Sequence, residues 1–209
     1  MINLLESFGI ILTILLSYII YKEKNYNLVI FGVILIPYAI IWEYLGIGEV
    51  WVYTTPSGVN YSFYILEGMP LVIPLGWSLS MMLLAWLTIK VSNRIKISRL
   101  LLLFLFGMVW GLIFELSFVN LGYWHYLVDP QIANLRPNVP FGWGILTASL
   151  VLTFEILWDK FGNNLKEKPY KFPLFFIAYF ANIIFLIVFL KFIAINIMDP
   201  LCMATLCKH

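Results

Sequence analysis

Two glutamates stand late in long apolar segments, where a carboxyl group is unusual. Glu43 lies in the run at 27–45 and Glu115 in the run at 99–119. A charge in hydrocarbon costs a few kcal/mol even on insertion scales, so we expect both side chains to face the interior of a helix bundle. Burial favours a neutral carboxylic acid, which can act as a general acid or share a proton with a second carboxyl group. The alternative is that each glutamate only reaches interfacial water or a lysine.

The surroundings of the two glutamates match in order. Each is followed by a tryptophan and a tyrosine two positions apart, and then by proline, glycine and tryptophan at the start of the next apolar run. The first copy comprises Glu43, Trp51-Val52-Tyr53 and Pro74-Leu75-Gly76-Trp77, and the second Glu115, Trp124-His125-Tyr126 and Pro140-Phe141-Gly142-Trp143. The two units, about residues 27–89 and 99–159, have the same orientation, so we predict parallel repeats whose motifs converge on one cavity. Coincidence is the alternative, because tryptophan is favoured at membrane interfaces.

Aromatic side chains beside a buried acid suit one particular chemistry. A ring face stabilises a cation by about 0.5–2 kcal/mol, and protonation of an alkene creates such a cation. We therefore expect Glu43 and Glu115 to be catalytic in the hydration or cyclisation of an isoprenoid double bond. The candidate substrate-binding residues are Trp51, Tyr53, Trp77, Tyr123, Trp124, Trp143 and Asn138. Simple aromatic packing between helices, with Asn138 as a cap, is the competing interpretation.

No cofactor and no metal are expected. Cys202 and Cys207 are the two cysteines of the chain, and their spacing permits a small disulfide loop but fits no zinc pattern. The net charge of +2, without a basic stripe, argues against nucleic acid as a partner. The expected partners are a hydrophobic isoprenoid substrate and membrane lipids.

The elements that must position these side chains are membrane-spanning helices. Hydrophobic residues make up 62% of the chain and charged residues 11%, whereas soluble domains are about half apolar and about a quarter charged. Each crossing needs about 20 apolar residues. Runs of that length fall at about 3–21, 27–45, 70–89, 99–119, 142–159 and 172–195. The prediction is an all-α polytopic bundle of about six transmembrane helices, forming one domain over residues 1–209.

The loops predict the orientation of this bundle in the cell membrane. The connections at 46–69 and 121–141 are long, aromatic and poor in lysine and arginine. The other three are short and basic, with Lys22 and Lys24, then Lys90, Arg94, Lys96 and Arg99, then Lys160, Lys166, Lys168 and Lys171. The positive-inside rule places the basic loops in the cytoplasm, and both termini and the long loops outside.

Part of the chain resembles a known family. The segments Glu43-Tyr-Leu-Gly46, Trp51-Val-Tyr53 and Gly68-Met-Pro-Leu-Val-Ile-Pro-Leu-Gly-Trp77 resemble the integral-membrane carotenoid biosynthesis family, which includes a carotenoid hydratase that adds water to bacterioruberin precursors. Gly122-Tyr-Trp124 and Asn138-Val-Pro-Phe-Gly-Trp143 resemble it too, so the similarity covers about residues 40–145. It implies a membrane-embedded fold and a polyisoprenoid substrate. The paired acids are also similar to those of membrane-bound terpene cyclases, so hydration and cyclisation stay open.

A different class of function fits the same carboxyl groups. A small transporter or lipid-binding membrane protein would also use a central carboxylate-lined cavity between two repeats. One observation argues against transport. Apart from Pro37 in the second apolar run, no glycine or proline visibly breaks a run in mid-membrane. Labelling from both membrane sides discriminates, because alternating access supports transport and one-sided access supports an enzyme. A subunit that only binds partner helices is a third possibility.

Overall fold

The computed structural model describes residues 3–56, 60–66, 68–127, 134–136, 138–161 and 171–193. Over these residues the chain is mostly helical, as predicted, with six helices and four short strands. The elements are α1 (Leu4–Glu23), α2 (Asn27–Tyr44), β1 (Trp51–Tyr53), β2 (Tyr64–Leu66), β3 (Met69–Pro70), α3 (Val72–Ser92), α4 (Arg99–Asn120), β4 (Trp124–Tyr126), α5 (Asn138–Phe161) and α6 (Lys171–Ile193). Cys202 and Cys207 lie outside the described residues.

Five of these helices, α1 to α5, are long and apolar enough to cross a membrane. At 1.5 Å per residue a helix of about 20 residues spans the roughly 30 Å hydrocarbon layer. Their outward faces are apolar as well, since Ile11 and Ile14 of α1 are both 65% exposed. Large contiguous apolar surfaces of this kind mark contact with lipid or protein. The helices therefore indicate an integral membrane protein.

Small residues bring neighbouring helices close together. A Cβ atom at Gly107 of α4 would lie 2.4 Å from Thr147 Oγ1 of α5, and one at Gly32 of α2 would lie 2.2 Å from Met82 Sδ of α3. The Ser78 hydroxyl also donates a hydrogen bond of 2.7 Å to the Gly32 carbonyl oxygen. Helices in lipid associate through such close backbone approaches and interhelical hydrogen bonds. These contacts fix α2 against α3 and α4 against α5.

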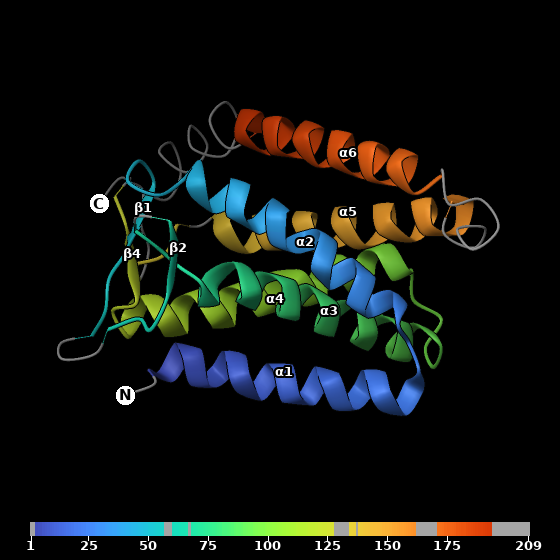
Figure 1. Ribbon diagram of the computed structural model, residues 1–209, viewed down its shortest axis with the longest axis horizontal. Helices are drawn as coiled ribbons and strands as arrows, with labels where there is room; N and C mark the ends of the chain where they lie inside the picture. Colours follow the sequence, from blue (N-terminus) through green and yellow to red (C-terminus); the bar gives the residue numbers. More distant parts are fainter. Residues whose placement is uncertain are drawn as a thin grey trace.

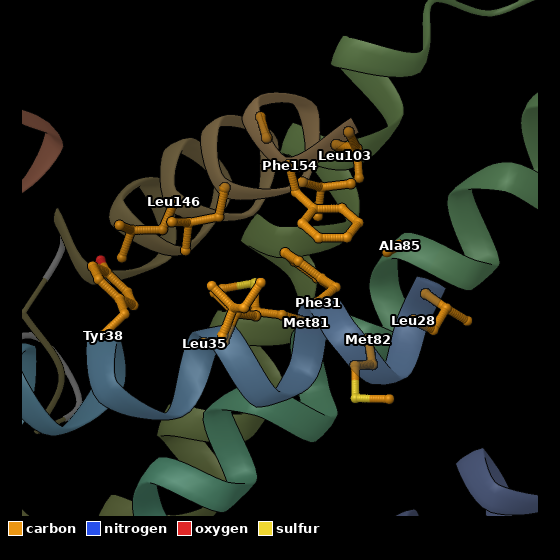
Figure 2. Packing of buried hydrophobic residues seen from close by; sticks show 14 of the residues in the cluster. Leu28, Phe31, Leu35, Tyr38, Met81, Met82, Ala85, Leu103, Leu146 and Phe154 are labelled. Atoms are coloured by element: carbon orange, nitrogen blue, oxygen red, sulfur yellow. The ribbon is translucent and has the colours of Figure 1, made fainter. Parts of the chain in front are cut away.

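The packed core fills the middle of the bundle. Figure 2 shows the α2 side chains Leu35 and Tyr38 beside Met81 of α3 and Leu146 of α5, and Phe31 beneath Phe154 of α5. Helices α1 and α6 lie at opposite sides of this core in Figure 1. The central helices α2 to α5 therefore form the framework on which the glutamates are placed.

The two ends of the bundle differ in chemistry. Figure 1 shows the strands and the N-terminal end of the chain at one end, and the α1–α2 and α3–α4 connections at the other. At the latter end, Lys90 Nζ lies 2.8 Å from a Glu23 carboxyl oxygen, and Arg99 pairs with Glu155. Glu155 of α5 is thus tied to α4. The α1–α2 and α3–α4 connections, both basic, therefore lie at the end away from the strands.

Short strands join the two long loops. The all-helical prediction did not include these strands. Strands β1 and β4 pair antiparallel in the register Trp51↔Tyr126, Val52↔His125 and Tyr53↔Trp124. Strands β2 and β3 form a second antiparallel pair. Segments of two or three residues are too short for their periodicity to indicate a strand. The β1–β4 ribbon brings residues 71 to 75 positions apart in the sequence next to each other.

Candidate functional site

The β1–β4 ribbon explains why tryptophan and tyrosine are spaced two positions apart in both loops. Alternate side chains of a strand share one face, so Trp51 and Tyr53 lie on the same side. Trp124 and Tyr126 face them directly across the antiparallel register and therefore share that side. His125 lies on the opposite face and is exposed. The ribbon presents two indoles and two phenols to the bundle.

Glu43 is enclosed by three hydrogen-bond donors, and only 2% of the residue is exposed. Its Oε2 atom accepts hydrogen bonds from Trp51 Nε1 at 3.0 Å and from the Tyr53 hydroxyl at 2.5 Å. Its Oε1 atom accepts one from Trp77 Nε1 at 2.7 Å. Donors therefore occupy three of the roughly four lone-pair positions of the carboxyl group, and one position on Oε1 is left.

Glu115 has the same arrangement, atom for atom, and is 8% exposed. Its Oε2 atom accepts hydrogen bonds from Trp124 Nε1 at 3.0 Å and from the Tyr126 hydroxyl at 2.9 Å. Its Oε1 atom accepts one from Trp143 Nε1 at 2.9 Å. The residues that match between the two sequence repeats thus make matching hydrogen bonds. We call each glutamate with its two tryptophans and one tyrosine a carboxyl cage.

The two cages touch each other through aromatic rings. The indoles of Trp77 and Trp143 stack with centroids 4.4 Å apart and planes inclined by 15°. Tyr53 of one cage meets Trp124 of the other edge to face at 5.9 Å. Offset stacking and edge-to-face contacts are the favoured arrangements of aromatic pairs. The carboxyl groups therefore belong to one continuous aromatic assembly.

Different turns lead from each helix into its strand. After α4, Gly122 adopts φ +79°, and the amides of Gly122 and Tyr123 donate to the carbonyls of Val119 and Phe118, which is a Schellman ending. After α2, the amides of Gly46 and Ile47 both donate to the Glu43 carbonyl. Unequal turns explain why the two glutamates are 72 positions apart and the two strand tryptophans 73. Matching cages form in spite of this offset.

Glycine at position 46 is required by the first cage. A Cβ atom there would lie 1.9 Å from Cη2 of Trp51, a separation that real structures do not show. The missing side chain lets the indole lie flat on the end of α2 and reach Glu43. Gly111 does the same for the second cage, because its Cβ position lies 2.4 Å from Cγ of Trp143.

One cavity of about 250 Å³ contains both carboxyl groups. Helix α1 closes one side of it with Leu5, Phe8 and Leu12. Of the nine side chains predicted to form the site, eight line the cavity and one does not. Lining the cavity are Glu43, Glu115, Trp51, Tyr53, Trp77, Trp124, Trp143 and Asn138. Most of the remaining lining is aliphatic or aromatic, as in sites for hydrophobic ligands.

Tyr123 is the predicted site residue that does not line the cavity. Its hydroxyl accepts a hydrogen bond of 3.0 Å from the amide of Leu4, and its carbonyl accepts one of 3.1 Å from the Tyr61 hydroxyl. Tyr123 thereby anchors the start of α1 to the second long loop. This position supports the wall of the cavity that α1 provides.

Other residues line the cavity beside the predicted ones. Phe114 precedes Glu115 as Trp42 precedes Glu43 in the sequence repeat, whereas no motif singled out Arg136. Asn138, at the start of α5, has its Oδ1 atom buried with no hydrogen-bond partner. A buried acceptor of this kind is satisfied when a ligand or water donates to it. The Asn138 amide oxygen is therefore a polar acceptor of the cavity lining besides the carboxyl groups.

The two cage tyrosines remain donors over the whole working pH range. Burial is the main cause that raises the pKa of Tyr53 and of Tyr126 well above 10.0, and the neighbouring glutamate in each cage raises it further. A neutral phenol keeps its proton and continues to donate to the carboxyl group. The tyrosines therefore remain neutral donors that hold the glutamates in place.

Replacing Tyr53 or Tyr126 with phenylalanine should destabilise the protein by a similar amount in each case. Each change removes one donor from a buried carboxyl group, a loss of about 1–3 kcal/mol. Thermal unfolding in detergent, followed by circular dichroism, measures the effect. Tyr44→Phe is the matched control, because Tyr44 of α2 is 68% exposed and should tolerate the change. An unchanged melting temperature for both cage variants would show that the phenol contacts contribute nothing.

The fold and the site define the class as a polytopic helical membrane protein with two carboxyl cages on one aromatic cavity. No protein-family model matches the chain, and neither a curated protein nor a solved structure matches it. Its function is therefore inferred from the geometry of the site and from the sequence motifs.

Proposed function

We propose that the protein is a membrane-embedded enzyme that protonates a carbon–carbon double bond of a polyisoprenoid lipid. The observation that carries the proposal is the pair of buried carboxyl groups, held in matched aromatic cages on one apolar cavity. A buried carboxylic acid is a suitable proton donor, and indole faces suit the cation that protonation creates. The resemblance to carotenoid hydratases and terpene cyclases supports the same substrate class.

The hydrogen bonds indicate which oxygen carries the reactive proton. Oε2 of each glutamate already accepts two hydrogen bonds, whereas Oε1 accepts one from an indole and retains a lone-pair position. The acid proton therefore belongs on Oε1. Transfer breaks that O–H bond and forms a C–H bond at the less substituted alkene carbon. The cation at the more substituted carbon then faces the stacked indoles of Trp77 and Trp143.

The second glutamate completes the reaction as a base. In hydration, water attacks the cation and the second carboxylate takes the proton that the water releases. In cyclisation, another double bond attacks, a C–C bond forms, and the same carboxylate removes the proton from the final cation. Either way one proton leaves one glutamate and one arrives at the other. Because the cages match, the enzyme then stands ready for the next turnover with the two roles exchanged.

The size of the cavity suits the end of a chain. Sites for drug-sized molecules typically measure about 300–1,000 Å³, and the cavity of about 250 Å³ is smaller. The reacting end of a long lipid would occupy it while the remainder lies between helices or in the bilayer.

The proposed topology has six crossings, with α6 as the last, a parallel repeat, and the cages near the outer face. The basic connections then lie in the cytoplasm.

Reaction in heavy water tests this proposal directly. Purified protein in detergent, given geranylgeraniol or lycopene as probes in D2O, should yield a product that retains one deuterium on carbon. Parallel incubation in H2¹⁸O separates the two outcomes, because hydration adds ¹⁸O and cyclisation does not. Mass spectrometry reads both labels. If the probes bind but no carbon-bound deuterium appears, the enzyme proposal fails and a lipid-binding or transport role replaces it.

A further inference from the structure

Six of the glycines within helices α2 to α5 fall into two groups. At Gly32, Gly107, Gly111 and Gly144, a Cβ atom would lie between 2.2 and 2.8 Å from a neighbouring helix. These four are explained by helix packing. At Gly76 of α3 and Gly142 of α5, a Cβ atom would meet no atom within 4 Å. Glycine inside a helix is destabilising relative to alanine, so these two positions need a different explanation.

Gly76 and Gly142 occupy equivalent places. Each is the fifth residue of its helix and comes directly before an indole that donates to a glutamate. Both glycines line the cavity that holds the carboxyl groups. The indoles that follow them, Trp77 and Trp143, stack on each other. The two missing side chains therefore leave space on both walls beside the stacked indoles.

We propose that Gly76 and Gly142 determine specificity by leaving room for the methyl branches of an isoprenoid chain. The space that each glycine leaves is that of one methyl group, since alanine differs from glycine by a methyl group. A trisubstituted isoprenoid alkene carries one methyl branch on the carbon that becomes cationic. Glycine on both walls admits that branch in either orientation of the double bond. An unbranched alkyl chain needs no such space.

This inference rests on the proposed function for the class of ligand, but its test is a binding measurement that needs no turnover. Tryptophan fluorescence of the full-length protein in detergent is titrated with geranylgeraniol, which is methyl-branched, and with hexadecan-1-ol, which is not. The wild type should bind the branched alcohol more tightly. Gly76→Ala combined with Gly142→Ala should weaken geranylgeraniol binding at least tenfold and hexadecan-1-ol binding no more than twofold.

The melting temperature distinguishes a variant whose cavity is filled from a variant whose fold is damaged. The double alanine variant should melt at the same temperature as the wild type or higher, because neither added methyl group meets a protein atom. Gly111→Ala is the contrasting control and should melt lower, because its Cβ would lie 2.4 Å from Trp143. Wild-type affinity in the double variant, equal weakening for both alcohols, no binding of geranylgeraniol by the wild type, or a lowered melting temperature would each overturn the inference. Binding as expected without turnover would leave it intact and refute the proposed reaction.

Discussion

Replacing both Glu43 and Glu115 with glutamine should abolish conversion of an isoprenoid substrate while the protein still folds in detergent. An amide has no acidic proton to give to an alkene and does not accept one as a carboxylate does. A positioned general acid or base contributes about 10²–10⁴-fold to a rate. The double variant loses both groups, so product should fall below detection in the heavy-water assay.

The single variants sharpen this prediction. Because the two cages make the same contacts, Glu43→Gln and Glu115→Gln should each reduce turnover by about 10²-fold or more and to a similar extent. A large loss for one and none for the other would show that a single acid works alone. Full activity in the double variant would refute any role for the carboxyl groups in the reaction.

Folding of the glutamine variants needs its own control. The amide oxygen of Gln at position 43 can accept from Trp51 and Tyr53, as Oε2 does in the wild type. The amide nitrogen then faces the N–H of Trp77, so two donors meet. Adding Trp77→Phe removes that conflict and should restore part of any lost melting temperature. Inactivity in a variant with restored stability would be chemical in origin and not a result of unfolding.

The helices were predictable because burial in lipid demands long apolar runs. The run at 99–119 corresponds to α4, which extends from Arg99 to Asn120. The fifth helix begins earlier than its apolar run suggested, at Asn138 and not at 142. Proline is tolerated in the first turn of a helix, where its missing N–H would have no partner, so Pro140 does not delay the start. Hydropathy alone misses such a polar first turn.

The members of the site were predictable from local spacing, but their arrangement was not. Two residues two positions apart share a strand face, and this physical constraint underlies the Trp51 and Tyr53 pattern. Nothing in the local sequence shows that β1 pairs with β4, because that contact joins distant segments. Tyr123 was predicted to bind substrate, yet it lies in the turn before β4 and anchors α1. Arg136 belongs to no repeated motif, so no pattern of residues selected it.

Replacing Glu43 with leucine should destabilise the protein much more than replacing it with glutamine. Leucine accepts no hydrogen bond, so the N–H groups of Trp51 and Trp77 and the hydroxyl of Tyr53 would lose their acceptor in an apolar site. Each buried donor without a partner costs about 1–3 kcal/mol. Three of them together approach the whole stability of an ordinary domain, which is about 5–15 kcal/mol.

Thermal unfolding and gel filtration in detergent measure this effect. Glu49→Leu is the matched control, because Glu49 is exposed in the loop that follows the same helix and should tolerate the change. Glu115→Leu should behave like Glu43→Leu, since its cage also has three donors. If both leucine variants melted like the wild type, the cages would contribute nothing to the fold. The opposite result would show that the carboxyl groups hold the aromatic walls of the cavity together, so glutamate is required there before any substrate binds.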